Sequence, residues 1–179
     1  MQSAKRFSAD LIYLPVHAKV NYTRFTFTES KWELLKGAPC PVVLIRPGAK
    51  EARKVILAAV NFQAQREVQR ELNKIILEQA RHYAQLYNAE LHVVNAYLDS
   101  MNYPDRGRLV RETGLEQDRI HVNNGYTSEV IAQVADEINA DLVVMGTLGQ
   151  NGMTSSRRGN TAERLIAGLD DDVMVINHE

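Results

Sequence analysis

Residues 140–160 read ADLVVMGTLGQNGMTSSRRGN, an apolar run that leads into a glycine-rich segment. The run at 141–145 is typical of a strand in a parallel sheet that helices cover on both faces. Three glycines, Gly146, Gly149 and Gly159, follow with the spacing G-x2-G-x9-G. Because glycine permits unusual backbone angles and a close approach of ligand to main chain, this strand and loop predict a phosphate-binding turn before a helix.

The same stretch occurs twice in the chain. A shift of 131 residues aligns residues 9–45 with residues 140–176 without a gap, and eight of the 37 pairs are identical. A shift of that length has the size of a whole domain. Residues 1–48 are therefore predicted to be the C-terminal remnant of one unit, and residues 49–179 a complete second unit.

Composition and charge exclude several classes of protein. The chain is 45% apolar and 24% charged with a formal net charge of −1, which favours a globular fold and gives no overall attraction to nucleic acid or an acidic membrane. No apolar run is long enough to span a bilayer, and the first residues lack the apolar segment of a signal peptide. Cys40 is the only cysteine, so no internal disulfide can form. We expect a cytoplasmic protein without nucleic-acid or membrane partners.

Predicted strands and helices alternate strictly after residue 50. Strands are expected at 54–60, 90–97, 119–122, 141–145 and 173–177, and helices at 67–87, 108–113, from Thr127 or Ser128 as the cap to about 138, and 161–167. Such alternation predicts a parallel sheet with helices on both faces. The first strand ends in VNFQ (60–63) rather than a glycine-rich motif, so the candidate phosphate loop follows the fourth strand instead.

Several motifs together resemble the universal stress protein superfamily, and its tandem UspE-like type in particular. They are ADLVVMGT, the three-glycine spacing, GNTAE at 159–163 and the closing apolar strand. The resemblance covers residues 54–178, and residues 9–46 resemble the end of a preceding unit. It implies an α/β fold with an open five-stranded parallel sheet in the order 3-2-1-4-5, Rossmann-like and of the adenine nucleotide alpha hydrolase-like kind.

The resemblance also implies a cleft for ATP or another adenine nucleotide between the first and fourth strands. The implied contacts are Val60, Asn61, Ala96, Met145, Gly146, Gly149, Gly159, Asn160 and Thr161, with the glycines and the last two at the phosphates and the Ala96 main chain at adenine. Asn61 replaces an acidic residue of the family, so it offers no charge to a metal. Asn160 replaces a Ser or Thr of the family, so it offers no hydroxyl to a phosphate. We expect weak binding with no metal.

The sequence contains no recognisable catalytic constellation. No nucleophile elbow or paired carboxylates lie near the glycines, and His82, His92 and His121 have no further ligand at a metal-binding spacing. We expect a non-enzymatic, stress-response binding and interaction module. Two other interpretations stay open: a slow ATPase or phosphoryl carrier, and a structural dimerisation module with an empty cleft, in which the glycines only allow a tight passage from strand to helix.

The remnant is predicted to dock through its last strand. Its expected strand at 10–14, helix at 30–36 and strand at 42–45 cannot close a core alone. The family resemblance implies that 42–45 lies antiparallel beside 173–177 and covers a sheet edge. Apolar surface left over is expected either to drive self-association or to leave the segment mobile. We expect a homodimer, or another pairing between universal stress protein units, through the last strands.

Overall fold

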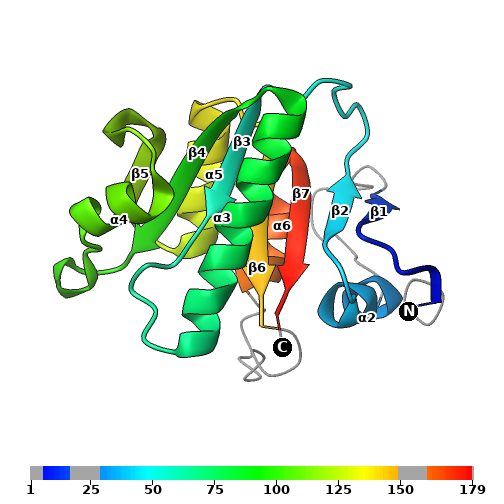
Figure 1. The fold of residues 1–179 in the computed structure, drawn as a ribbon, viewed down its shortest axis with the longest axis horizontal. Helices are drawn as coiled ribbons and strands as arrows, with labels where there is room; N and C mark the ends of the chain where they lie inside the picture. Colours follow the sequence, from blue (N-terminus) through cyan, green and yellow to red (C-terminus); the bar gives the residue numbers. More distant parts are fainter. Residues whose placement is uncertain (1–5, 17–28, 149–160, 179) are drawn as a thin grey trace.

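Seven strands form one sheet in the order β1-β2-β7-β6-β3-β4-β5 (Figure 1). The structure, a computed structural model, describes residues 6–16, 29–148 and 161–178. The strands are β1 (Ile12–Pro15), β2 (Val42–Ile45), β3 (Val55–Ala59), β4 (Glu90–Tyr97), β5 (Ile120–Asn124), β6 (Leu142–Thr147) and β7 (Asp172–Asn177). The helices are α2 (Glu29–Gly37), α3 (Glu67–Tyr87), α4 (Arg106–Thr113), α5 (Thr127–Glu137) and α6 (Thr161–Gly168), with short 3-10 turns at Ser100–Asn102 and Gln117–Arg119.

The predicted fold class is confirmed, and the sheet is larger than predicted. Strands β5-β4-β3-β6-β7 are mutually parallel and have the expected order 3-2-1-4-5. The expected five strands become seven because β2 pairs antiparallel with β7 and β1 pairs parallel with β2. The units predicted at 1–48 and 49–179 thus contribute to one sheet, and the division into two units stays a prediction.

The remnant repeats the strand register of the second unit. Ile12 lies opposite Val42 between β1 and β2, and Val143 lies opposite Val173 between β6 and β7, so the same shift of 131 relates both pairs. The antiparallel seam is centred on Val43 opposite Met174, which are also equivalent positions. The two last strands are therefore related by an approximate two-fold axis, and their predicted antiparallel pairing is confirmed. The edge of β7 is covered by this pairing.

Helices cover both faces of the sheet. Helix α3 crosses the front face in Figure 1, while α5 and α6 lie behind the sheet. One apolar cluster joins α3 to the front face, and the other packs α2, α5 and α6 against the opposite face. The remnant, through residues such as Leu35 and Val42, therefore shares an apolar core with the second unit. No helix in the described ranges combines the length and apolar character that crossing a membrane requires.

Two helix starts differ from the prediction. Helix α4 begins at Arg106, not at residue 108, because the Asp105 side chain accepts a hydrogen bond from the backbone N–H of Arg108 at 3.1 Å and caps the first turn. Tyr126 occupies the cap position of α5 and makes no side-chain cap bond, so the expected capping by Thr127 or Ser128 is wrong. In both helices the residue at the cap position, Asp105 or Tyr126, has extended backbone angles, and the sequence alone did not show at which residue the helix would begin.

A buried carboxylate, that of Asp172, joins the remnant to the second unit. The Asp172 carboxylate accepts hydrogen bonds from the backbone N–H of Arg46 at 2.8 Å and from the Arg53 guanidinium at 2.5 Å.

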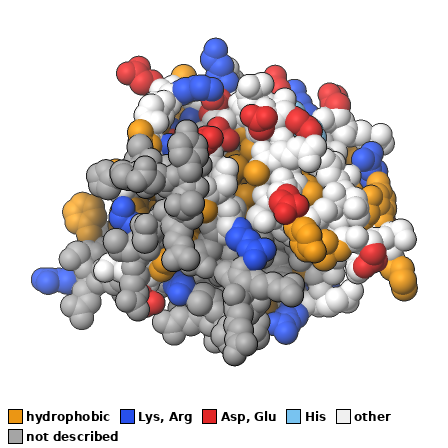
Figure 2. Space-filling view, turned by 180° about the vertical axis from the view of Figure 1, so that it is seen from behind, with side chains coloured by type: hydrophobic (Ala, Val, Ile, Leu, Met, Phe, Trp, Pro, Cys, Tyr) orange, Lys and Arg blue, Asp and Glu red, His pale blue; other side chains and the backbone are white. Residues whose placement is uncertain are grey.

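On the face seen in Figure 2, acidic side chains gather towards the upper edge. Burial, followed by repulsion from Asp170 and Asp141, raises the pKa of Asp171, the residue before Asp172, to about 6.

Candidate functional site

A cleft lies at the carboxyl ends of the neighbouring parallel strands β3 and β6. Its cavity volume is about 280 Å³. Ligands of open parallel sheets bind at such ends, where the strand order reverses. The cleft is lined by strand ends, by α3 on one face and by α5 and α6 on the other: Ala59, Val60, Asn61, Gln69, Leu72, Asn73, Ile76, Thr127, Ile131, Met145, Gly146, Thr147, Leu148, Ala162 and Leu165. We refer to it as the β3–β6 cleft.

Four of the nine predicted site residues line this cleft: Val60, Asn61, Met145 and Gly146. Thr161 is the first residue of α6 and directly precedes Ala162 of the lining. Ala96 lies on β4 and is not part of the lining. Gly149, Gly159 and Asn160 lie outside the described residues, so their predicted contacts with phosphate stay predictions.

The backbone of Asn61 is held in place by a side chain of α3. The Asn73 carboxamide accepts a hydrogen bond from the N–H of Asn61 at 3.0 Å and donates one to its carbonyl at 2.7 Å. Asn73 is buried, so this two-point contact compensates its own desolvation. The Asn61 side chain is exposed and makes no hydrogen bond with any described residue, which leaves its carboxamide available to a ligand.

Gly146 is in close contact with helix α3. A Cβ atom at this position would lie 2.6–2.7 Å from the Cγ, Cδ1 and Cδ2 atoms of Leu72. Its φ is not in the left-handed region, unlike that of Gly114 or Gly125. The structure therefore gives Gly146 a packing role in the described chain, whether or not a ligand also contacts it.

The Ala96 carbonyl already has intramolecular donors. The Gln63 carboxamide donates to it at 3.1 Å and to the Asn102 carbonyl at 2.8 Å, and the Asn95 carboxamide donates to it at 3.0 Å. Asn95 is fully buried and also accepts from the N–H of Phe62 at 2.8 Å, which fixes the chain after β3. A base that used the Ala96 carbonyl would have to displace Gln63. Sequence reasoning missed Gln63, Asn73 and Asn95.

The cleft carries no formal charge on its described lining, since every residue there is apolar, an amide or a threonine. Hydroxyls and amides can hydrogen-bond to a ligand, but proteins usually hold Mg²⁺ through one or two carboxylates. The described part of the cleft can thus contact a ligand through shape and hydrogen bonds, with no carboxylate to hold a metal.

Two histidines meet on neighbouring strands away from the cleft. His92 Nδ1 lies 3.1 Å from His121 Nε2, and burial and the nearby His92 lower the pKa of His121. Their diagonal position across β4 and β5 brings them together, a contact that their sequence spacing does not reveal. Within the described residues no group of three or more His, Cys, Asp or Glu side chains could hold a metal.

Comparisons with known proteins identify relatives of the whole described fold. Residues 105–177 match the model of the universal stress protein family. The Universal stress protein E homolog of Haemophilus influenzae is 32% identical over 190 residues, covering 93% of this chain. The chain spans 62% of the length of that relative.

Solved structures show the same fold. A structure assigned to the universal stress proteins, from Pseudomonas aeruginosa UCBPP-PA14, has 27% identity and a TM-score of 0.82 over 98% of this chain and 66% of that chain. A universal stress protein in complex with cAMP has 18% identity and a TM-score of 0.54 over 70% of this chain and 98% of that chain. The second likeness shows the fold alone.

Proposed function

Because residues 105–177 match the universal stress protein family model and the chain is similar to a universal stress protein E homolog over 93% of its length, we propose that it is a non-enzymatic stress-response module of this family that binds an adenine nucleotide in the β3–β6 cleft. The observation that carries the proposal is the cavity at the strand-order reversal, lined by Val60, Asn61, Met145 and Gly146. The fold relative solved with cAMP supports an adenine nucleotide as the ligand class.

The size and polarity of the cleft support weak binding of a small nucleotide. A volume of about 280 Å³ is just under the range of roughly 300–1,000 Å³ that is usual for small-molecule sites. The free Asn61 carboxamide can hydrogen-bond to a ribose or a base, and apolar residues such as Met145 can pack against either. AMP therefore suits the described cleft better than a metal-bound triphosphate.

The non-enzymatic role is supported by the described lining. It contains no histidine, carboxylate, cysteine or lysine that could act as a general base, and its hydroxyls, those of Thr127 and Thr147, are not hydrogen-bonded to a base. These features favour a binding module over the alternatives of a slow ATPase or phosphoryl carrier.

One observation favours the second candidate, a structural module whose cleft stays empty. Gln63 occupies the Ala96 carbonyl, and the Leu72 side chain fills the space above Gly146. Both contacts are satisfied without ligand. In this account the sheet, including its antiparallel seam, serves assembly rather than binding.

Calorimetric titration separates the two candidates. We expect AMP and ATP to bind with Kd values in the range of about 0.1–10 mM, with little change when Mg²⁺ is added, since no described carboxylate holds the ion. Submicromolar, magnesium-dependent ATP binding would contradict the proposed weak site. If no heat of binding is measured at about 10 mM nucleotide, which equals the highest Kd expected, the structural module is favoured.

Cytoplasmic residence and homodimerisation are further parts of the proposal. The lone Cys40 is unpaired and half-buried, which suits a reducing compartment. Strand β1 ends the described sheet, and its Tyr13 is exposed, so this edge offers a surface for a second copy. Size-exclusion chromatography with light scattering would test the dimer, which a monomeric mass at all concentrations would contradict.

A further inference from the structure

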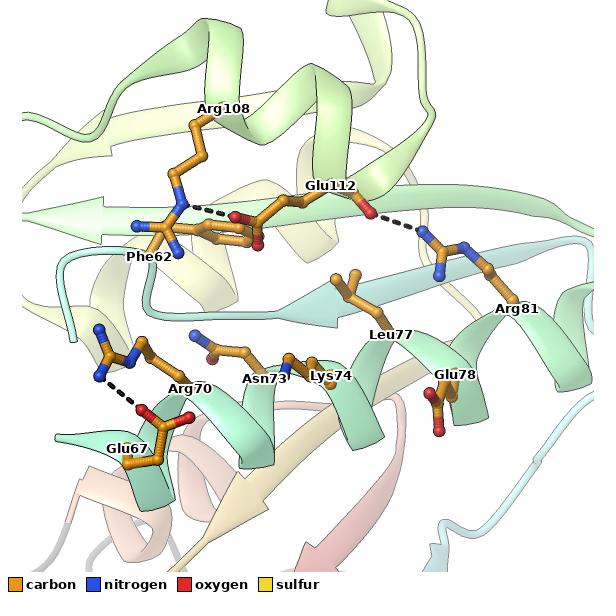
Figure 3. Close-up of a pocket in the computed structure, with 10 residues that line it drawn as sticks. All are labelled: Phe62, Glu67, Arg70, Asn73, Lys74, Leu77, Glu78, Arg81, Arg108 and Glu112. Atoms are coloured by element: carbon orange, nitrogen blue, oxygen red, sulfur yellow. Dashed lines mark hydrogen bonds and ion pairs between the residues drawn. The ribbon is translucent and has the colours of Figure 1, made fainter. Parts of the chain in front are cut away.

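A second cavity, of about 500 Å³, lies between α3 and α4 (Figure 3). We name it the α3–α4 groove. Its floor is apolar, because the side chains of Phe62 and Leu77 are buried there. The groove shares Asn73 with the β3–β6 cleft but is otherwise lined by different residues. Its volume lies within the range of roughly 300–1,000 Å³ that is usual for small-molecule sites.

Cationic side chains from both helices line the groove. Arg70, Lys74 and Arg81 come from α3, and Arg108 comes from α4 on the opposite wall. Positions 70, 74 and 81 follow the four- and seven-residue spacing of one helical stripe, which aims them at the same wall. The cations are therefore placed by the geometry of α3 and not scattered over the surface.

These four cations differ in how firmly they are held. Arg81 donates to the carbonyls of Glu112 at 2.9 Å and Thr113 at 2.7 Å, so it fixes the C-terminal end of α4. Arg70 and Arg108 each form one ion pair, with Glu67 and Glu112 respectively, at 2.5 Å. Lys74 has no ion-pair partner among the described residues.

The two ion pairs can be exchanged for a ligand at low cost. The side chains of Glu67 and Glu112 are 65% and 43% exposed, so each carboxylate can turn into solvent without losing hydration. Exposed pairs of this kind contribute only about 0–1 kcal/mol to stability. A phosphate group offers three oxygens that can accept from two guanidinium groups and an ammonium group at once.

We propose that the α3–α4 groove binds the phosphate group of a small phosphorylated molecule through Arg70, Lys74 and Arg108. The buried floor formed by Phe62 and Leu77 receives the carbon skeleton of that molecule. Phe62 lies under the Arg108 guanidinium, with 5.7 Å from its Cζ to the ring centroid, so the ring also orients this arginine. This site is separate from the cleft proposed for the adenine nucleotide and does not depend on it.

Inorganic phosphate is a suitable probe, followed by amide NMR spectroscopy of the full chain. We expect saturable chemical-shift changes in residues 67–81 and 106–113. The double substitution Arg70→Ala, Arg108→Ala should weaken binding at least about tenfold, since it removes two charge-assisted contacts. The matched control is Arg66→Ala, Arg111→Ala, which removes two exposed arginines that do not line the groove and should leave the affinity unchanged.

A gain of affinity provides a second test. The double substitution Glu67→Gln, Glu112→Gln removes the two carboxylates that pair with Arg70 and Arg108, and leaves the third carboxylate of the lining, that of Glu78, in place. It should tighten phosphate binding several-fold, which corresponds to roughly 1 kcal/mol. The proposal is overturned if no saturable shift appears up to about 50 mM phosphate. It is also overturned if the shifts are confined to residues 142–148, or if Arg70→Ala, Arg108→Ala binds as tightly as the wild type. Circular dichroism of each variant checks that the helices remain folded.

Discussion

Replacing Gly146 with alanine should destabilise the protein by steric contact with one residue, Leu72. The added Cβ would lie 2.6–2.7 Å from three side-chain atoms of Leu72, closer than real Cβ contacts allow. Overpacking of this kind costs about 1–3 kcal/mol. Alanine also reduces the entropy of the unfolded chain, which returns about 0.5–1 kcal/mol because the φ of Gly146 is open to alanine. The net cost is about 0–2.5 kcal/mol, with a midpoint near 1 kcal/mol.

A double-mutant cycle assigns this cost to the contact. Leu72→Ala alone should cost about 2–5 kcal/mol through the lost buried leucine, towards the lower end because Leu72 already borders the cleft. In the Leu72→Ala background, Gly146→Ala should be neutral or stabilising by about 0.5 kcal/mol. The coupling energy between the two sites is therefore expected to equal the overpacking cost of about 1–3 kcal/mol, since the gain through the unfolded chain is the same in both backgrounds.

Urea unfolding of the wild type, both single variants and the double variant measures the cycle. Gly168→Ala is the matched control, because a Cβ at Gly168 meets nothing within 4 Å and this variant should not be destabilised. The reasoning is refuted if Gly146→Ala costs the same with and without Leu72, or if it stabilises the wild type as much as it stabilises the Leu72→Ala variant. Either result would leave Gly146 with no packing role.

Three further predictions concern the junction between the two units. The pKa of Asp171 is raised to about 6 from an unfolded value near 4, so its contribution to stability is full below pH 4 and is lost as pH rises through 6. Asp171→Asn should therefore raise the free energy of unfolding by about 1 kcal/mol at pH 7.5, after allowance for solvent screening at this half-buried position, and by nearly nothing at pH 4. Urea unfolding at both pH values measures this, and an equal gain at the two values would contradict it. Asp172→Ala leaves the buried Arg53 without its carboxylate and should cost about 3–5 kcal/mol, whereas a loss below about 1 kcal/mol would show that the ion pair is dispensable. Deleting residues 1–48 uncovers the β7 edge and should lower the melting temperature and promote aggregation in light scattering; a deletion variant as soluble and stable as the full chain would mean that the remnant covers nothing important.

The alternation of elements and the internal repeat could be read from the sequence. Helix α3 has the bounds predicted from its 3.6-residue periodicity, Glu67–Tyr87, and the shift of 131 residues recurs in the strand register. The pairing of β2 with β7 followed from the family resemblance and is confirmed. The helix bounds and the repeat depend on local periodicity or on repetition, which a single sequence displays, whereas the strand pairing needed the resemblance.

The details of the candidate site could not be read in this way. Gln63 reaches the Ala96 and Asn102 carbonyls, which are 33 and 39 residues away, and such contacts leave no local pattern. The closeness of Leu72 to Gly146 depends on how α3 packs across the sheet. The sequence indicated that the glycine matters at this strand end, but not that its neighbour is a leucine. Hydrophobic periodicity also gives no sign of the α3–α4 groove, since the cations there occupy positions expected to be solvated.

The measurement that tests the proposed function most directly is the affinity for AMP of the wild type and of Gln63→Ala. The variant frees the Ala96 carbonyl from one donor, and the loss of one competing hydrogen bond is worth about 0.5–1.5 kcal/mol. We predict that Gln63→Ala binds AMP about 2- to 10-fold more tightly than the wild type, while the control Gln133→Ala, an exposed glutamine on α5, binds like the wild type. Weaker binding by Gln63→Ala would contradict a contact between the base and the Ala96 carbonyl. No binding by either protein at about 10 mM AMP, the weakest affinity expected, would contradict an adenine nucleotide site in this cleft.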